Sequence, residues 1–313
     1  DGGKKIIGIH EIHMEEDAGK LLHDEWENCS LVDYNRSGVP LIEIVSEPDM
    51  RSAEEVIAYL EKLRLIIQYL GVSDCKLQEG SMRADINLSV RETGADTLGT
   101  RTEMKNLNSF KAIMRAIEGE RERQTDLLEE GKEVVQETRR WDDVKGASYA
   151  MRSKEDAQDY RYFPDPDLAP IVVSDEMLEE LRRRQPEFRT AKMARYKEEY
   201  GIPDYDIEII TGTKRMADLF EETTALCGQP KKVSNWLMGE TLRLMKEKEV
   251  DAENLRFSPE HLAGLIRLVD SKAINGPVAK EVFEVMFEQD IEPERYVDCL
   301  LYTSPSPRDR TRS

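Results

Sequence analysis

The stretch that decides the fold of the N-terminal part reads Ile12-His13-Met14-Glu15-Glu16-Asp17-Ala18-Gly19-Lys20. The residues from Ile6 to Met14 alternate loosely and favour β-structure, which predicts a strand that runs into the three carboxylates. Side chains two positions apart share a face of a strand, so His13 and Glu15 point one way and Glu16 the other. A run of this kind is most often a solvated loop, and a metal ligand is the alternative.

A second strand that carries carboxylates is predicted at Leu41 to Glu47, after a turn that begins at Arg36. Glu43 lies in the middle of this strand between apolar neighbours, where burial would be costly without a cation or metal. An edge strand with Glu43 in water is equally compatible with the pattern. Carboxylates on two strands can hold Mg²⁺ against a phosphate, so the acidic run and Glu43 are candidate sources of metal ligands.

Length and composition limit the class of protein. The 313 residues suggest about two domains, and the formal net charge of −19 argues against non-specific binding of polyanions, so any RNA contact must be local. No apolar run approaches the roughly 20 residues that a membrane span needs. The four cysteines form no C-x-x-C pair, which supports neither a zinc site nor a disulfide framework and favours a reducing compartment such as the cytoplasm.

A third polar strand is predicted at Arg83 to Arg91, and it has the clearest alternation in the chain. One face presents alternating polar side chains, which suit a phosphate, the water shell of a metal or the polar end of a nucleotide. An ordinary solvated face of an antiparallel sheet explains the pattern equally well. The next strand, Thr100 to Asn106, carries Lys105. The residues of the polar face are Arg83, Asp85, Asn87, Ser89 and Arg91.

Helical patterns replace strands after Ser174 and follow one another with short breaks. We therefore predict an α+β fold class: a domain with a mixed or antiparallel sheet over residues 1–181, followed by an all-helical domain over residues 182–298. Residues 299–313 resemble the translation of a sequencing-library adapter, and we expect them to be non-native; a natural tail rich in Ser, Pro and Arg is the alternative.

Several long motifs, spread in order over almost the whole chain, resemble the B subunit of the bacterial tRNA-dependent amidotransferases, GatB of GatCAB. The motifs are His13 to Lys20, Asp33 to Asp49, Glu79 to Asp85, Lys105 to Phe110, Gln136 to Asp142, Asp159 to Leu168, and Asn235 to Gly239.

This resemblance implies a ligase that forms a carbon–nitrogen bond with glutamine as the nitrogen donor. With ATP and Mg²⁺, GatB would phosphorylate the side-chain carboxylate of Glu mischarged on tRNA(Gln), or of Asp on tRNA(Asn). Ammonia supplied by GatA would then give Gln-tRNA or Asn-tRNA. The implied partners are GatA and GatC, the A and C subunits of a heterotrimer, and the mischarged tRNA, in the bacterial cytoplasm and without a membrane.

The resemblance also implies roles for individual residues. The strand-rich part corresponds to the cradle-like catalytic domain of the family. Glu16 and Glu43 match metal-ligand positions of the family and, with Asp85, form the expected catalytic set. We therefore expect the carboxylates of Glu16 and Glu43 to converge within reach of one metal ion. The helical part resembles the helical and tail domains that bind tRNA. The expected substrate- or phosphate-binding residues lie in these motifs or in the polar strands. They are Lys20, Arg36, Arg83, Asn87, Lys105 and Asn106.

The chain departs from the family pattern at both ends. An opening segment with a Gly-x-Glu-x-His strand and the last part of the tail domain have no counterpart here, so we expect the chain alone to be inactive. Two other classes of function remain: a non-catalytic adaptor that presents tRNA to a partner protein, and a generic Mg²⁺-dependent phosphohydrolase. The polar strand from Arg83 argues against the adaptor, and the helical part argues against the phosphohydrolase.

Overall fold

The computed structural model describes residues 3–24, 29–151 and 169–303. The chain forms two compact units, each of which is described by itself. The strand unit comprises residues 1–61 and 83–156, and the helical unit comprises residues 62–82 and 157–313. Helix α1 (Ala53–Leu70) contributes residues to both units. It begins after Ser52, as the capping box predicts, and it ends before Gly71, whose φ is +73°.

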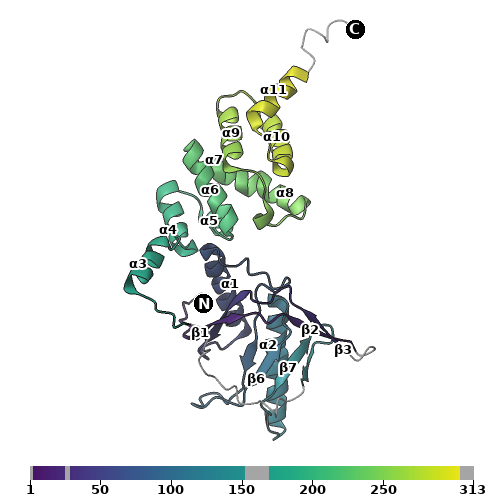
Figure 1. Ribbon diagram of the computed structural model, residues 1–313. Coiled ribbons are helices and arrows are strands. Elements are labelled where there is room, and N and C mark those ends of the chain that lie inside the picture. Colours follow the sequence, from purple (N-terminus) through teal and green to yellow (C-terminus); the bar gives the residue numbers. More distant parts are fainter. Residues whose placement is uncertain (1–2, 25–28, 152–168, 304–313) are drawn as a thin grey trace. The chain divides into compact units, whose positions relative to one another are not determined.

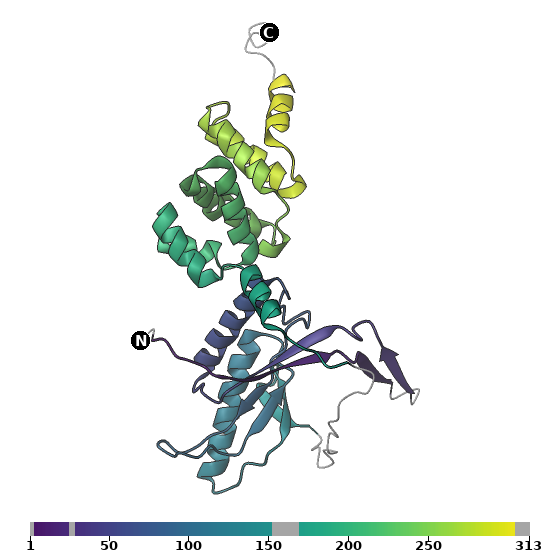
Figure 2. The same ribbon diagram turned by 60° about the vertical axis from the view of Figure 1, so that its left-hand side comes forward.

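Two antiparallel strand pairs form the first part of the strand unit. Strand β1 (Ile9–Glu16) pairs with β4 (Pro40–Ser46), and β2 (Lys20–Asp24) pairs with β3 (Cys29–Asp33). The β2–β3 hairpin projects beyond the β1–β4 ribbon (Figures 1 and 2). The sequence Ala18-Gly19-Lys20 is typical of a turn, and the strand that begins at Lys20 was not predicted. Every residue of β1 is exposed, so nothing in the described part of the chain buries this strand, whereas β4 is partly buried.

A four-stranded sheet forms the second part of the strand unit, in the order β5-β6-β7-β8. The strands are β5 (Ile86–Leu88), β6 (Thr102–Lys105), β7 (Thr138–Asp142) and β8 (Ala147–Ala150). The β6–β7 pair is parallel, and helix α2 (Phe110–Glu129) makes the crossover that a parallel pair requires. Helix α2 lies along one face of the sheet (Figures 1 and 2).

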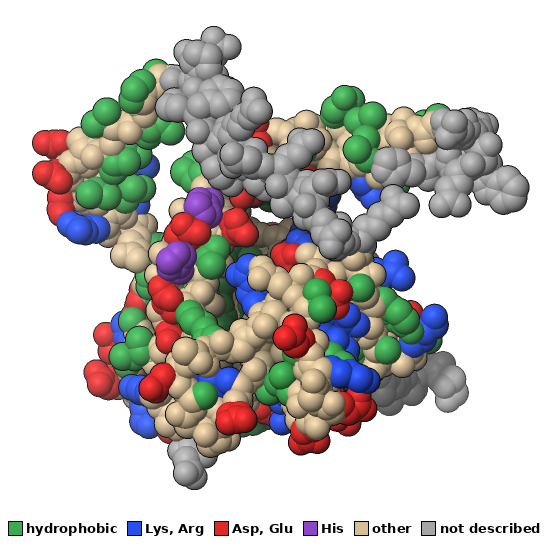
Figure 3. All heavy atoms as spheres, turned by 90° about the horizontal axis from the view of Figure 1, so that it is seen from below, with side chains coloured by type: hydrophobic (Ala, Val, Ile, Leu, Met, Phe, Trp, Pro, Cys, Tyr) green, Lys and Arg blue, Asp and Glu red, His purple; other side chains and the backbone are tan. Residues whose placement is uncertain are grey.

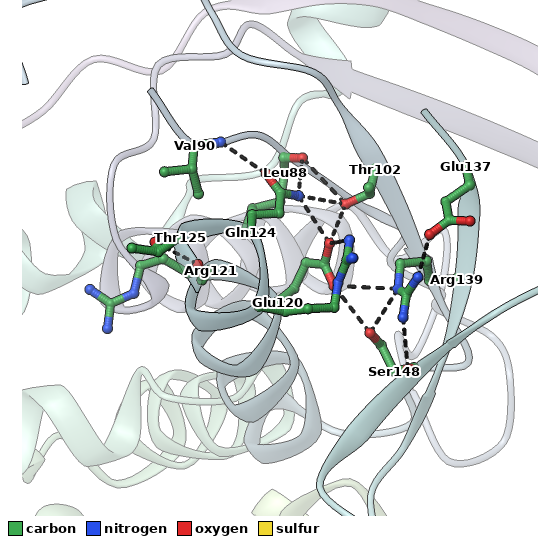
Figure 4. Close-up of polar contacts among 11 residues, drawn as sticks. Leu88, Val90, Thr102, Glu120, Arg121, Gln124, Thr125, Glu137, Arg139 and Ser148 are labelled. Carbon is green, nitrogen blue, oxygen red and sulfur yellow. Dashed lines mark hydrogen bonds and ion pairs between the residues drawn. The ribbon is translucent and has the colours of Figure 1, made fainter. Parts of the chain in front are cut away.

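Glu120 of α2 is completely buried and ties the helix to the sheet (Figure 4). Its carboxylate accepts hydrogen bonds from Thr102 Oγ1 at 2.8 Å and from Ser148 Oγ at 3.1 Å. Arg123 donates two more bonds, at 2.7 and 2.9 Å, and Gln124 donates one at 2.9 Å. A buried charge is tolerated only when it is paired and hydrogen-bonded in this way, so the network fixes how α2 sits on the strands.

The helical unit packs around one hydrophobic core, in which Phe257 and Phe283 meet edge to face with ring centroids 5.3 Å apart. The helices are α3 (Asp175–Arg184), α4 (Arg189–Tyr200), α5 (Asp204–Ile210), α6 (Lys214–Cys227), α7 (Pro230–Trp236), α8 (Leu242–Glu247), α9 (Pro259–Asp270), α10 (Gly276–Gln289) and α11 (Pro293–Thr303). The pattern of residues from Lys231 to Lys248 predicts a single helix. Instead, a π-helical turn (Leu237–Thr241) joins α7 to α8, and Thr241 Oγ1 donates to the carbonyl of Trp236 at 3.1 Å.

The predicted fold class is confirmed: a strand-rich α+β part precedes a helical part. The expected domain boundary between residues 181 and 182 lies inside α3, and the compact units divide at other positions. Helix α11 continues to Thr303, so the first residues of the stretch that we expect to be non-native, 299–313, are helical. The motif from Asp159 to Leu168 lies outside the described residues. No helix in the described part of the chain is long and apolar enough to cross a membrane.

Candidate functional site

The register of the β1–β4 ribbon separates the two expected metal ligands. Glu43 lies opposite His13, whereas Glu16 lies opposite Pro40. Since Pro40 and Glu43 are three residues apart on one strand, their side chains leave opposite faces, and so do those of Glu16 and Glu43. The prediction that the two carboxylates converge is therefore wrong for this chain. The alternation of side chains along each strand was predicted correctly, but alternation within a strand does not determine the register in which two strands pair.

The face that carries Glu43 also carries His13. The Nε2 atom of His13 lies 3.0 Å from a carboxylate oxygen of Glu11. The hydrogen bond with Glu11 raises the pKa of His13 above its ordinary value, and the charges of Glu43 and Glu15 add to the effect. Glu43 itself is exposed, so burial gives it no need of a cation. Over the described ranges, no three His, Cys, Asp or Glu side chains are grouped so that they could hold a metal ion.

Asp17 is the one residue of the acidic run 15–17 that is buried, with 8% of its side chain exposed. Its Oδ1 atom accepts a hydrogen bond from the backbone N–H of Gly19 at 2.9 Å. Its Oδ2 atom accepts one from Arg83 at 3.1 Å and lies 3.6 Å from Nε of Arg36. The Gly19 N–H is the main cause that lowers the pKa of Asp17, and the two guanidinium charges lower it further. The two arginines, both expected phosphate-binding residues, thus meet at one carboxylate.

The backbone around Asp17 holds this carboxylate in place. The N–H of Asp17 donates to the carbonyl of Val39, and the N–H of Gly38 donates back to the carbonyl of Asp17. Gly19 has φ of +84°, and a Cβ atom there would lie 2.6 Å from the carbonyl oxygen of Asp33, so only glycine fits. Asp17 was not among the residues predicted from the sequence. Its signal was an Asp two residues before a Gly, which is typical of a turn closed by the Asp side chain.

The strand predicted from Arg83 to Arg91 is shorter in the structure, where β5 covers only Ile86–Leu88. Exposure still alternates from Arg83 to Leu88, with Arg83, Asp85 and Asn87 exposed and the residues between them partly buried. Nζ of Lys105 lies 3.0 Å from Asp85 and 3.1 Å from Glu103. Partial burial works to lower the pKa of Lys105, but the two carboxylates outweigh it and raise the pKa. The structure therefore brings Asp85 and Lys105 together on the sheet face opposite α2.

Three other predicted residues lie near these groups without joining them. Asn87 lies opposite Glu103 in the β5–β6 pair. Asn106 has a φ of +67°, and its side-chain amide donates a hydrogen bond to the backbone carbonyl of Trp141 at 3.3 Å. Its side chain is thus engaged with the backbone. Lys20 begins β2 and lies opposite Asp33. The candidate site thus consists of the Asp17–Arg36–Arg83 cluster and the Asp85–Lys105 pair, and Arg83 and Asp85 are two residues apart on an alternating segment.

Comparison with known proteins identifies the family. A family model described as the GatB/GatE catalytic domain matches residues 1–179. The chain belongs to the GatB/GatE family. A second model, described as a GatB domain, matches residues 218–303. All of the candidate site residues fall within the stretch that matches the GatB/GatE catalytic domain, and the second match lies within the helical unit.

Curated relatives of this GatB/GatE chain are named as the B subunit of the aspartyl/glutamyl-tRNA(Asn/Gln) amidotransferase. The protein of Agathobacter rectalis is 71% identical over 296 residues, and that of Lachnoclostridium phytofermentans is 70% identical over 298 residues; each alignment covers 95% of this chain. The protein of Caldicellulosiruptor bescii is 58% identical over 297 residues, 94% of this chain. The chain spans 62% of the length of each of these three relatives.

Proposed function

We propose that this chain forms part of the GatB component of a tRNA-dependent amidotransferase. In this proposal, ATP phosphorylates the side-chain carboxylate of Glu mischarged on tRNA(Gln), or of Asp on tRNA(Asn), and ammonia then converts it to the amide. The match of residues 1–179 to the GatB/GatE catalytic domain carries the proposal. The names of the relatives support the substrate class, and the cluster of Arg36 and Arg83 on Asp17 supports binding of a phosphate group.

The chemistry explains why ATP is needed. A carboxylate resists attack by ammonia because oxide would have to leave. An oxygen of the carboxylate therefore attacks the γ-phosphorus of ATP, and ADP departs. Ammonia then attacks the acyl carbon, phosphate leaves with the bonding electrons, and a proton is released. Guanidinium groups donate paired hydrogen bonds to phosphate oxygens, so Arg36 and Arg83 would stabilise the charge of the transferred group. Lys105 would contribute a point charge on the same unit.

We include a magnesium ion in the proposal only because the family resemblance implies one. When bound, it would supply positive charge that neutralises the phosphate groups. The described residues do not fit it by themselves, because Glu16 and Glu43 leave opposite faces and no three potential ligands are grouped there. We therefore derive no step through the metal. The proposal also includes a heterotrimer with GatA, which would supply ammonia, and GatC, and it assigns tRNA binding to the helical unit.

The test uses the full-length GatB protein that contains this chain, assembled with GatA and GatC. Radiolabelled ATP is supplied with mischarged Glu-tRNA(Gln), with correctly charged tRNA, or without tRNA. We expect ATP cleavage to depend on the mischarged tRNA and Gln-tRNA to form. ATP cleavage that ignores the tRNA would indicate a generic phosphohydrolase. Unchanged tRNA-dependent ATP cleavage in an assembly without this GatB protein would place the activation on a partner protein and indicate an adaptor.

Variants then test the candidate residues. Lys105→Met should lower kcat/KM about 100-fold, as loss of one group that stabilises transition-state charge does elsewhere. The matched control is Lys132→Met, since Lys132 is an exposed lysine of the same unit and pairs with Glu130. Equal activity of the two variants would remove Lys105 from the site. Full activity of both Glu16→Gln and Glu43→Gln would remove the metal from the proposal.

A further inference from the structure

We propose that Asp17 is a positioning residue, which holds Arg36 and Arg83 together as a two-armed binding site for the polyphosphate of a nucleotide. This inference rests on the proposed function, because it names the site at which the ATP of that reaction would bind. Asp17 would not touch the ligand. It would act through the two guanidinium groups that share its Oδ2 atom.

The geometry suits a fixed support. One carboxylate oxygen of Asp17 is occupied by the N–H of Gly19, and the other faces both arginines. Backbone hydrogen bonds tie Asp17 to Val39 and Gly38, at 2.9 and 2.8 Å, which places it against the turn that carries Arg36. Arg83 reaches the same oxygen from a segment 66 residues away in sequence. The support is therefore rigid, while its two arms come from different parts of the strand unit.

The arms retain the capacity to bind a ligand. The side chains of Arg36 and Arg83 are 46% and 58% exposed, whereas that of Asp17 is 8% exposed. Each guanidinium has five N–H donors, so one contact with Asp17 leaves most of them available. Within the described residues, neither arginine forms an ion pair with a second carboxylate. Two positive charges face one negative charge, and the cluster keeps an excess positive charge.

The surroundings favour a compact polyanion over a nucleic-acid backbone. The chain has a net charge of −19, and Glu15 and Glu16 directly precede Asp17. On the face shown in Figure 3, Lys and Arg side chains are interspersed with Asp and Glu and do not form a stripe. An extended phosphate backbone is bound through many contacts along a basic surface. A nucleotide concentrates several charges at one point, which two convergent guanidinium groups can bind.

A competing explanation makes the opposite prediction. If Asp17 only neutralised the arginines, its removal would raise the local positive charge and tighten anion binding. If Asp17 positions them, its removal frees two flexible side chains that repel each other, and ordering them again costs rotamer entropy on binding. Asp17→Asn separates the two cases, because it keeps the shape and an acceptor for Gly19 while it removes the charge.

The first experiment measures binding of pyrophosphate and of ATP to this chain by titration calorimetry, with a short single-stranded RNA as a third ligand. We expect Asp17→Asn to weaken pyrophosphate and ATP binding about 10-fold, within the range of couplings between contacting residues. In an Arg36→Ala/Arg83→Ala background, Asp17→Asn should change binding less than about twofold, since its effect passes through the arginines. Tighter binding, an equal loss in both backgrounds, or loss of RNA binding alone would overturn the proposal.

Thermal unfolding would detect misfolding of Asp17→Asn. A second variant tests the inference independently of that substitution. Arg36→Lys/Arg83→Lys keeps both charges and leaves Asp17 in place, but it lacks the planar fork. Positioning predicts that it too weakens pyrophosphate binding about 10-fold, whereas a purely electrostatic site predicts no change. Unchanged binding of pyrophosphate would overturn the proposal.

The third experiment measures steady-state kinetics of the assembled full-length enzyme. There, Asp17→Asn should raise KM for ATP about 10-fold and leave KM for mischarged tRNA within about twofold, a split that general loss of structure would not produce. An equal rise in both KM values would contradict the inference. The binding experiment does not depend on catalysis. If the enzyme failed to amidate mischarged tRNA while Asp17→Asn still weakened pyrophosphate binding, the proposed function would fall and the binding site would stand.

Discussion

Two of the sheets in the strand unit, the β1–β4 ribbon and the four-stranded sheet, have similar alternating sequences and very different surroundings. In the four-stranded sheet, Met104 and Trp141 lie under α2 and are almost completely buried. In the β1–β4 ribbon, Ile12 and Met14 occupy equivalent alternating positions and stay exposed. Alternation produces an apolar face, but only a covering element removes that face from water. Single substitutions in the covered sheet should therefore affect stability most, while the ribbon contributes Asp17 at its end.

The largest expected effect comes from removing the buried carboxylate that joins α2 to the sheet. Glu120→Ala leaves Arg123 and the buried Arg139 without their shared partner, and such a loss costs about 3–5 kcal/mol. Hydrogen exchange of the amides in α2 and β6 should report the loss, since it resolves one unit at a time. Glu120→Gln keeps the volume and should cost less. Unchanged protection in Glu120→Ala would show that α2 covers the sheet without this network.

The same carboxylate makes the covered sheet sensitive to acid. Burial alone would raise the pKa of Glu120, but hydrogen bonds from Arg123, Gln124 and Thr102 outweigh burial and lower it. A carboxylate whose pKa is lower in the folded state stabilises the fold above its unfolded pKa, near 4.5, and this contribution is lost as the pH falls through the folded pKa. We expect protection of α2 to fall in that acidic window, and to fall less steeply in Glu120→Gln. The same slope in both proteins would contradict the assignment.

A matched pair of methionines compares the two sheets directly. Met104 is 0% exposed and Met14 is 83% exposed. Met104→Ala should cost about 2–5 kcal/mol through lost burial and the cavity that it leaves. Met14→Ala should stay within about 0.5 kcal/mol, because the side chain already lies in water. Denaturant titrations followed by hydrogen exchange measure both. A comparable cost at Met14 would mean that the ribbon face is buried in solution.

Local patterns predicted the parts of this fold that depend on near neighbours. The period of two from Arg83 to Leu88 appears in the exposure of those residues. Ser109 caps α2 by accepting a hydrogen bond from the N–H of Ala112, and α9 begins at Pro259 directly after Ser258. These features follow from sterics and hydrogen bonds within a few residues, so they can be read along the chain. The family match has the same origin, since it depends on the order of residues alone.

The candidate site depended on contacts that no local pattern encodes. Sequence parity placed Glu16 and Glu43 on definite faces of their strands, but the register of β1 against β4 decided that these faces are opposite. The hydrogen bond from Arg83 to Asp17 joins residues 66 positions apart, and it turned an overlooked member of an acidic run into the support of two arginines. The sequence by itself determined which residues carry charge and which way each strand alternates. Only the tertiary structure decided which charges meet, because pairing register and long-range packing are set by the whole fold.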